Sequence, residues 1–306
     1  GARRRRPLVA RRRAAVASRR RSMTRTPPAT LVVAAPAKVN LFLHVTGRRA
    51  DGYHTLESLF ALVDLADTIT LAHRDDGAVV RTNDVAGVPA GDDLAVRAAR
   101  ALQSAARVRA GVAIGLEKRV PQGAGLGGGS SDAASVLLAL NRLWSLDWPR
   151  ARLVELAATL GADVPFFVGG ENALARGIGD ALTPVTLPPL WVALAFPGAH
   201  VRTADIFAAP ELTRSTASAK IDVFSEGYGR NDLAVATVAR FPEVAEALAA
   251  LASVAPQARM TGSGACVFAA CATEREARGA LACVPPRIGR HLARTLARHP
   301  LAGFAP

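Results

Sequence analysis

The sequence predicts two domains of the α+β class. Three observations support this: the chain has 306 residues, half of them are apolar, and strand-like and helix-like segments follow one another without an internal repeat. A chain of this length and apolarity can bury a sizeable core, so a disordered protein is excluded. Runs of strands mixed with helices that cover one face are typical of α+β domains.

The first part of the folded chain consists of strand-like segments. Residues 31–45 alternate apolar and polar positions with the period of a strand, and this pattern places Lys38 and Asn40 on one face. A turn that contains glycine leads into two further β-like runs at 53–62 and 67–71. These segments predict an antiparallel layer.

Helices and strands alternate in the rest of the chain. We expect helices over 92–106, 130–143, 149–160, 231–251 (one or two, broken near Pro242) and 273–284, and strands over 112–116, 191–196 and 265–271. An aspartate caps the first of these helices, and Gly161 is a natural C′ residue for the third. A glycine-rich stretch at 171–180 marks the expected domain boundary. The predicted units are a disordered leader at 1–28, a first domain at 29–176 and a second at 177–306.

The formal net charge of +13 is concentrated at the N-terminus. Residues 1–28 contain eleven arginines and no acidic residue, which leaves 27 basic against 25 acidic residues in the rest of the chain. Such a leader cannot bury enough apolar surface to fold, and three interpretations stay open: sequence upstream of a start at Met23, an organelle transit peptide, or an arm for nucleic acid. We expect deletion of residues 1–22 to leave activity unchanged.

Cysteine content and hydropathy restrict the class of protein further. The three cysteines form no C-x-x-C pair and have no histidine at zinc-finger spacing, which argues against a disulfide framework or structural zinc and favours reduced thiols. No apolar run approaches the roughly 20 residues that span a bilayer. We therefore expect a cytoplasmic protein without a membrane partner.

The most informative segment is the glycine loop, residues 121–131, between a predicted strand and an apolar helix. Five of the seven residues from Gly123 to Gly129 are glycine, so the backbone can approach a ligand closely and turn successive N–H groups into one concavity. The following helix adds the positive end of its dipole. The loop predicts an anion site, with Ser130 and Ser131 available to cap the helix or to reach a phosphate or its metal.

Three other interpretations of the glycine loop are weaker. Gly123, Gly125 and Gly128 satisfy G-x-G-x-x-G, but the acidic residue expected about 20 positions later would be Asp147, which follows the same helix rather than a second parallel strand. Walker A fits worse because no Gly-Lys-Ser/Thr follows. A tight turn alone needs one or two glycines, not five.

Four segments together resemble the GHMP family of small-molecule kinases. They are residues 36–43 (PAKVNLFL) with 47–60 (GRRADGYHTLESLF), the glycine loop, residues 161–167 (GADVPFF) and residues 260–268 (MTGSGACVF). The glycine loop marks only the superfamily. Asp-Gly-Tyr-His after Pro-Ala-Lys-Val-Asn is more specific, because it resembles the family members that act on a diphosphocytidyl substrate.

The resemblance implies a fold and a reaction. The fold is the two-domain GHMP kinase fold, with an N-terminal nucleotide-binding domain, a C-terminal ferredoxin-like domain on the substrate side and the catalytic cleft between them. The reaction is phosphorylation of the 2-hydroxyl of 4-diphosphocytidyl-2-C-methyl-D-erythritol, with ATP and Mg²⁺, in non-mevalonate isoprenoid biosynthesis. One alternative is a small-alcohol kinase of the mevalonate or homoserine type. The other is a nucleic-acid-binding protein that uses the leader, but the nearly neutral body lacks an aromatic and basic stripe, so we expect no nucleic-acid partner.

Lys38 and Asp163 match the catalytic pair of the family. Phosphoryl transfer needs a group that takes the proton of the acceptor hydroxyl, and the resemblance gives this role to Asp163. An ammonium group beside that carboxylate would keep it ionised and stabilise a developing alkoxide. On their own, Asp163 can be read as a helix N-cap and Lys38 as a solvated edge residue.

The resemblance also implies nucleotide contacts along the glycine loop. The expected ATP-binding residues are Pro121, Gln122, Gly123, Ala124, Gly125, Leu126, Gly127, Gly128, Gly129, Ser130, Ser131 and Lys118. A solvated surface lysine is an equal alternative for Lys118. The chain departs from the family at Asp93, where asparagine is expected, and this puts one nucleotide contact in doubt. No metal ligand is assigned, because no carboxylate cluster with ligand spacing is present.

The expected substrate-binding residues are Asn40, Tyr53, His54 and Phe207. Tyr53 and His54 offer one stacking face and one hydrogen-bonding edge, the combination that recognises an unstacked base. We expect Phe207 to close the other side of the base. For a bare Tyr-His pair, ordinary packing is the alternative. The sequence does not predict an oligomeric state.

Overall fold

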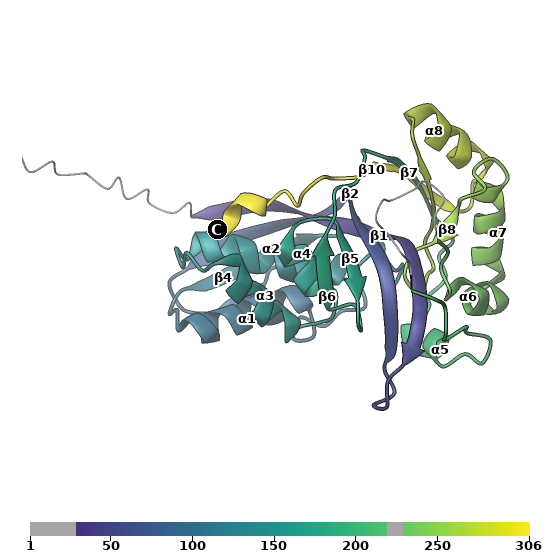
Figure 1. The fold of residues 1–306 in the computed structure, drawn as a ribbon. Coiled ribbons are helices and arrows are strands. Elements are labelled where there is room, and N and C mark those ends of the chain that lie inside the picture. The colour runs from purple at the N-terminus through teal and green to yellow at the C-terminus, as the bar shows by residue number, and fades with distance from the viewer. Residues whose placement is uncertain (1–28, 219–228) are drawn as a thin grey trace, which may run out of the picture.

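Residues 29–218 and 229–306, the part of the chain that this computed structural model describes, form two sheets with helices on their outer faces (Figure 1). The arginine-rich leader lies outside the described residues, and so do the predictions made for it. Among the described residues, no helix is long and apolar enough to cross a membrane.

The larger sheet has six strands and is built around a long hairpin. β1 (Thr30–Arg48) pairs antiparallel with β2 (His54–Arg74), and β2 pairs along its other edge with β4 and β5. The remaining strands of this sheet are β3 (Val79–Arg81), β4 (Gly111–Glu117), β5 (Ala173–Arg176) and β6 (Ala181–Pro184). The prediction of two separate runs at 53–62 and 67–71 is wrong. They belong to one strand, because a bulge and not a turn separates Val63 from Ala66.

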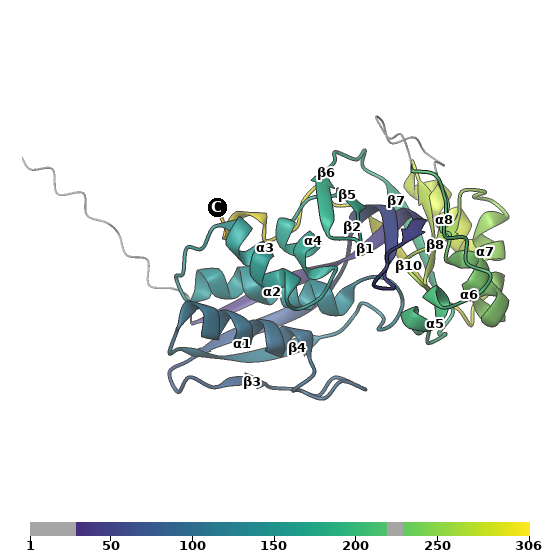
Figure 2. The same ribbon diagram turned by 60° about the horizontal axis from the view of Figure 1, so that its bottom comes forward.

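Four helices pack against one face of this sheet (Figures 1 and 2). They are α1 (Leu94–Ala106), α2 (Gly128–Leu143), α3 (Arg150–Ala158) and α4 (Val164–Gly169). Asp93 caps α1 as predicted, because its side chain accepts a hydrogen bond from the Ala95 N–H at 2.9 Å. The prediction for Gly161 is wrong, since α3 ends earlier and Thr159 is its C-cap. The Thr159 hydroxyl binds the Leu156 carbonyl at 2.7 Å, so no left-handed glycine is needed there.

The smaller sheet has the strand order β10-β7-β9-β8. Its strands are β7 (Trp191–Phe196), β8 (Arg259–Met260), β9 (Val267–Cys271) and β10 (Gly289–Arg294). Its helices are the short α5 (Thr203–Phe207), α6 (Ala234–Arg240), α7 (Pro242–Ala252) and α8 (Glu274–Cys283). Pro242 opens α7, which accounts for the predicted break, and Thr273 caps α8 in a capping box with Glu276.

The hairpin and the smaller sheet share an apolar cluster. Val39 and Phe42 from β1 lie in one buried cluster with Val192 from β7 and Phe268 from β9. The last residues of the chain then return to the larger sheet, where a 3₁₀ turn (Ala302–Phe304) ends against α2 (Figure 1). The predicted α+β architecture with two units is confirmed. The division of the chain at residue 176 stays a prediction.

Candidate functional site

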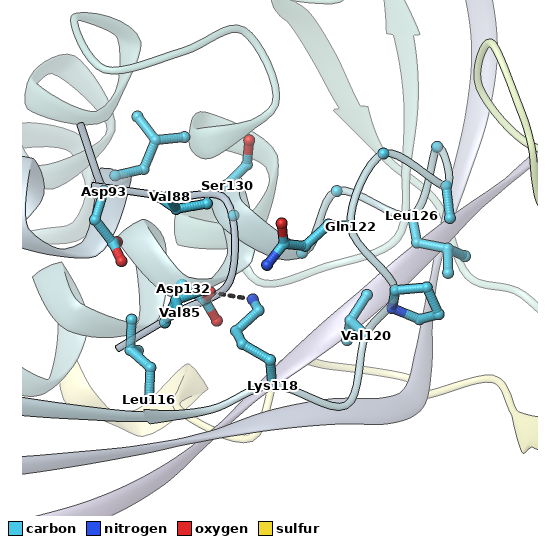
Figure 3. Close-up of a pocket in the computed structure, with 18 of the residues that line it drawn as sticks. Val85, Val88, Asp93, Leu116, Lys118, Val120, Gln122, Leu126, Ser130 and Asp132 are labelled. Carbon is cyan, nitrogen blue, oxygen red and sulfur yellow. Dashed lines mark hydrogen bonds and ion pairs between the residues drawn. The ribbon is translucent and has the colours of Figure 1, made fainter. Parts of the chain in front are cut away.

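The glycine loop joins β4 to α2, and two of its carbonyl groups accept hydrogen bonds from distant parts of the backbone. The Leu126 carbonyl accepts a hydrogen bond from the Lys38 N–H at 3.0 Å, and the Ala124 carbonyl accepts one from the Cys266 N–H at 3.2 Å. The other side of the loop lines a cavity of about 400 Å³ (Figure 3). The loop is therefore held by one edge while its opposite edge faces open space.

Three positions of the loop need glycine for their backbone conformation. Gly123, Gly125 and Gly127 have φ values of 66°, 75° and 71°, a region that costs other residues energy. A Cβ atom at Gly125 would also lie 2.3 Å from the Thr261 carbonyl oxygen, and one at Gly127 would lie 3.0 Å from the Phe167 ring. The glycines thus permit both a left-handed turn and close contact with distant segments.

The N-terminus of α2 opens onto this cavity. The N-cap is Gly127, which has no side chain to occupy the first N–H groups of the helix. The prediction that Ser130 or Ser131 caps the helix is wrong, because both lie inside its first turns. The Ser131 hydroxyl is buried and donates to the Pro36 carbonyl at 2.6 Å, whereas Ser130 lines the cavity. Free N–H groups at the start of a helix suit an anion such as phosphate.

A buried cluster of charges lies at one wall of the cavity, where Lys118 and Asp132 belong to the lining. The Lys118 ammonium lies 2.5 Å from Asp67 and also contacts Asp132 (Figure 3). With only 19% of its side chain exposed, Lys118 is not a solvated surface lysine. Asp67 also accepts hydrogen bonds from the backbone N–H groups of Arg119 and Val120, so it fixes the start of the loop.

Burial and neighbouring charges shift the pKa values of Asp132 and Lys118. Burial raises the pKa of Asp132 to about 7, with Lys118 opposing the shift and Asp67 adding to it. Burial alone would lower the pKa of Lys118, but the two carboxylates outweigh it and raise that pKa. The second carboxylate oxygen of Asp132, Oδ1, is buried without a hydrogen-bond partner. Sequence reasoning missed Asp67 and Asp132, although Asp132 directly follows the serines of the loop.

Asp93, where the family pattern has asparagine, has a structural role in this chain. One of its oxygens caps α1, and the other accepts a hydrogen bond from Arg81 at 2.8 Å. Asp93 is 6% exposed, although it belongs to the lining of the cavity. Its carboxylate is therefore neutralised by Arg81 rather than presented as a free charge to a nucleotide.

Lys38 and Asp163 meet beside the loop. The Lys38 Nζ lies 3.7 Å from Asp163 Oδ2 and donates a hydrogen bond to Asn40 Oδ1 at 2.6 Å. Lys38 is buried, so it is not a solvated edge residue, while the Asp163 side chain is 34% exposed. Asp163 precedes α4, yet its side chain makes no capping hydrogen bond. Its carboxylate is therefore available to a ligand.

Asn40 connects the hairpin to the turn at 260–264. Its Oδ1 also accepts hydrogen bonds from the Gly262 N–H at 2.9 Å and the Thr261 hydroxyl at 3.1 Å, while its Nδ2 donates to Ser58 at 2.8 Å. With these partners, Asn40 holds Lys38 in place. Thr261 was not singled out from the sequence, because only the fold brings it to Asn40.

A second, smaller cavity of about 170 Å³ adjoins the first. Lys38, Asn40 and Asp163 line it together with Phe207, and it shares Gly125 and Gly127 with the larger cavity. We call the larger cavity the nucleotide pocket and the smaller one the acceptor pocket, after the ligands that the family resemblance implies for them. The predicted catalytic pair thus lies where the two pockets meet.

Tyr53, His54 and Phe207 lie near the tip of the hairpin. The His54 and Phe207 rings stack with their centroids 5.0 Å apart and their planes 24° apart, which leaves no room for a base between these two rings. Tyr53 is 64% exposed. The structure therefore brings His54 and Phe207 into contact with each other and leaves the Tyr53 ring in solvent.

Comparisons with known proteins agree with this geometry. The sequence profile described as "GHMP kinases N terminal domain" matches residues 93–171, and the one described as "GHMP kinases C terminal" matches residues 219–289. A 4-diphosphocytidyl-2-C-methyl-D-erythritol kinase of Thiobacillus denitrificans is 57% identical over 272 residues, which cover 89% of this chain and 98% of that protein. One of Cupriavidus necator is 54% identical over 91% of this chain and 97% of its own length.

Solved structures show the same relationship. The crystal structure of a 4-(cytidine 5'-diphospho)-2C-methyl-D-erythritol kinase superposes with a TM-score of 0.76 at 37% identity, and covers 87% of this chain and 99% of that chain. A homoserine kinase from Cytophaga hutchinsonii has a TM-score of 0.67 at 17% identity over 89% of this chain and 96% of its own, which shows the fold alone. The chain therefore belongs to the 4-diphosphocytidyl-2-C-methyl-D-erythritol kinase family of the GHMP kinases.

Proposed function

We propose that the protein is an ATP-dependent kinase that phosphorylates the 2-hydroxyl of 4-diphosphocytidyl-2-C-methyl-D-erythritol, in non-mevalonate isoprenoid biosynthesis. The observation that carries the proposal is the contact between Lys38 and Asp163 at 3.7 Å, at the junction of an anion-binding pocket and a second pocket. The two pockets of the protein match the two substrates of a phosphoryl transfer. The names of the relatives favour the diphosphocytidyl substrate over mevalonate or homoserine.

In this proposal Asp163 accepts the proton of the acceptor hydroxyl. Its carboxylate makes no capping bond and is partly exposed to the acceptor pocket, so it can reach a bound hydroxyl. The buried Lys38 ammonium next to it favours the ionised carboxylate and attracts the negative charge that develops on the acceptor oxygen. Asn40 keeps the ammonium in position.

The glycine loop binds the phosphates of ATP in the same proposal. The first N–H groups of α2 face the nucleotide pocket without a capping side chain, and Lys118 adds a positive charge to its wall. Magnesium fits this pocket, because Ser130 and Asp132 both line it and the buried Oδ1 of Asp132 has no hydrogen-bond partner. These two residues would hold a Mg²⁺ ion that remains largely bound to phosphate and water. When bound, the ion neutralises charge on the transferred phosphoryl group.

We further propose that the enzyme works in the cytoplasm without a nucleic-acid partner. Cys266 is buried as a free thiol, which suits a reducing compartment. Outside the leader, basic and acidic residues nearly balance.

A coupled assay that detects ADP release tests the proposal. We expect the purified protein to turn over the diphosphocytidyl polyol in the presence of ATP and Mg²⁺, and to leave mevalonate, homoserine and methylerythritol phosphate without the cytidine essentially unchanged. Faster turnover of one of these other alcohols would assign the acceptor pocket to that substrate. Equal turnover with and without the cytidine would show that the base is not recognised.

A further inference from the structure

Arg214 connects the hairpin tip to the segment that follows α5. Its Nε donates a hydrogen bond to His54 Nε2 at 3.1 Å. Its two terminal nitrogens donate to the carbonyls of Leu212, Phe207 and Ala209 at 3.1, 3.1 and 2.7 Å. These hydrogen bonds to backbone carbonyls therefore fix the position of the guanidinium beside His54.

This contact determines which nitrogen of His54 carries the proton. Arginine is only a donor, so His54 Nε2 must accept, and in a neutral imidazole the proton is then on Nδ1. Burial lowers the pKa of His54, and the neighbouring charges of Arg214 and Arg48 lower it further. His54 is therefore neutral near pH 7, with Nδ1–H as its donor.

The surroundings of His54 leave this donor available. One face of the imidazole stacks on Phe207, which lines the acceptor pocket, and the Nε2 edge is occupied by Arg214. Among the described residues, His54 Nδ1 has no hydrogen-bond partner. The one open polar position of the ring is therefore a donor.

We propose that Arg214 is a positioning residue that makes the enzyme select cytosine over uracil. The inference rests on the proposed function, because it assumes that the base of the substrate reaches His54. The N3 atom of cytosine is an acceptor, whereas N3 of uracil carries a proton. An Nδ1–H group therefore pairs with cytosine and opposes uracil. With the opposite tautomer, Nδ1 would be an acceptor and the preference would reverse.

The tautomer can be measured without substrate. Histidine labelled with ¹³C and ¹⁵N reports the protonated nitrogen through its ring chemical shifts, and the His54 signal is identified by its loss in His54→Asn. We expect Nδ1–H in the wild type near neutral pH and a shift toward Nε2–H in Arg214→Met. The control is Arg202→Met, since the side chain of this arginine is 73% exposed and lies 3.8 Å from Asp205 rather than near His54. A wild-type His54 protonated on Nε2, or a tautomer unchanged in Arg214→Met, would overturn the proposal.

Base selection is measured as the ratio of kcat/KM for the cytidine substrate to that for its uridine analogue. We expect this ratio to fall about tenfold or more in Arg214→Met, the size of effect expected for one wrong base contact, while the KM for ATP stays the same. If Arg214 acts only through its hydrogen bond to the Phe207 carbonyl, its loss would lower kcat/KM for both substrates equally and leave the ratio unchanged. That result would count against the proposal.

Two substitutions of His54 itself separate the two nitrogens while Arg214 remains. Asparagine offers an amide donor close to the Nδ1 position, and glutamine places its amide near Nε2, facing Arg214. We expect His54→Asn to keep most of the preference for cytidine and His54→Gln to lose it; the reverse order would overturn the proposal. A wild type that accepts both bases equally would overturn it but leave the kinase activity standing. A wild type that phosphorylates neither substrate would instead refute the proposed function, and the tautomer measurement would still test the contact of Arg214 with His54.

Discussion

The nucleotide pocket and the acceptor pocket are built from the chain in different ways. The described residues that line the nucleotide pocket lie within one segment of the chain, between Val85 and Asp132. The acceptor pocket takes residues from Lys38 through Ser263: strands of the larger sheet, the glycine loop, and the helix ends and turns that flank the smaller sheet. A pocket made by one stretch can be recognised from a local pattern, whereas the other exists only once the chain has folded.

Asp163→Asn tests whether the chemistry belongs to the acceptor pocket alone. The amide keeps the shape of the side chain but accepts no proton, so we expect kcat to fall by about 10²-fold or more. Nucleotide binding, measured by titration calorimetry, should be unchanged because Asp163 does not line the nucleotide pocket. Asp75→Asn, at a fully exposed position, is the matched control. Turnover within a factor of a few of wild type would remove Asp163 from the role of base.

Gly125→Ala tests whether the two pockets can be separated at all. Gly125 belongs to both, and an alanine would combine a φ of 75° with a Cβ atom 2.3 Å from the Thr261 carbonyl. We expect the free energy of unfolding to fall by about 3 kcal/mol and the KM values for both substrates to rise.

Gly129→Ala is the control for this variant, because its Cβ would meet nothing closer than 3.7 Å and it lies within α2. We expect its free energy of unfolding to equal that of the wild type or to be slightly higher. Equal denaturant midpoints for the two variants would contradict the role given to Gly125.

Much of the fold follows from local patterns. The hairpin strands, α1, α2 and the break at Pro242 agree with periodicity, capping residues and proline. Departures occurred where a strand pairing or a side-chain hydrogen bond replaced the signal that the pattern displays. A bulge joins two expected strand runs into one strand, and a threonine hydroxyl ends α3 where a glycine was expected.

The candidate site divides in the same way. The anion site could be recognised because its glycines serve a backbone conformation that the sequence displays directly. Asp67 and Arg214 could not be recognised, because each is an ordinary polar residue until the fold brings it to Lys118 or His54. Thr261 lies in the segment 260–268 that resembles the family, but only the fold brings it to Asn40. Lys38 and Asp163 were identified by family resemblance and not by spacing.

His299 tests how far α2, whose N-terminus opens onto the nucleotide pocket, depends on the C-terminal tail for its stability. The His299 ring accepts a hydrogen bond from the Leu301 N–H at 3.1 Å and lies 3.3 Å from the Ser135 hydroxyl of α2. Burial, together with the charge of Arg150, lowers the pKa of His299 to about 4. The unfolded chain therefore binds a proton on this residue at a higher pH than the folded one does.

This difference predicts a pH-dependent stability. The contribution of neutral His299 is complete above pH 6.5 and is lost as the pH falls toward 4, by up to about 3 kcal/mol in the free energy of unfolding. Urea unfolding of wild type and His299→Gln across this range measures it, with the more exposed His73→Gln as control. If the variant and the wild type lose stability in parallel, His299 is not the group responsible.

Tyr53→Ala gives the smallest expected effect and tests how far the acceptor pocket extends. Tyr53 is 64% exposed at the tip of the hairpin, so its truncation should leave the free energy of unfolding unchanged. A tyrosine ring that stacks on a base contributes about 1–3 kcal/mol, so we expect the KM for the diphosphocytidyl substrate to rise by about 10- to 100-fold and that for ATP to stay the same. Arg49→Ala, a 54% exposed residue of the same turn, controls for changes at the tip that do not involve stacking. Unchanged kinetics in Tyr53→Ala would show that the exposed ring makes no contact with the substrate. The substrate-binding surface would then end at His54 and not include Tyr53.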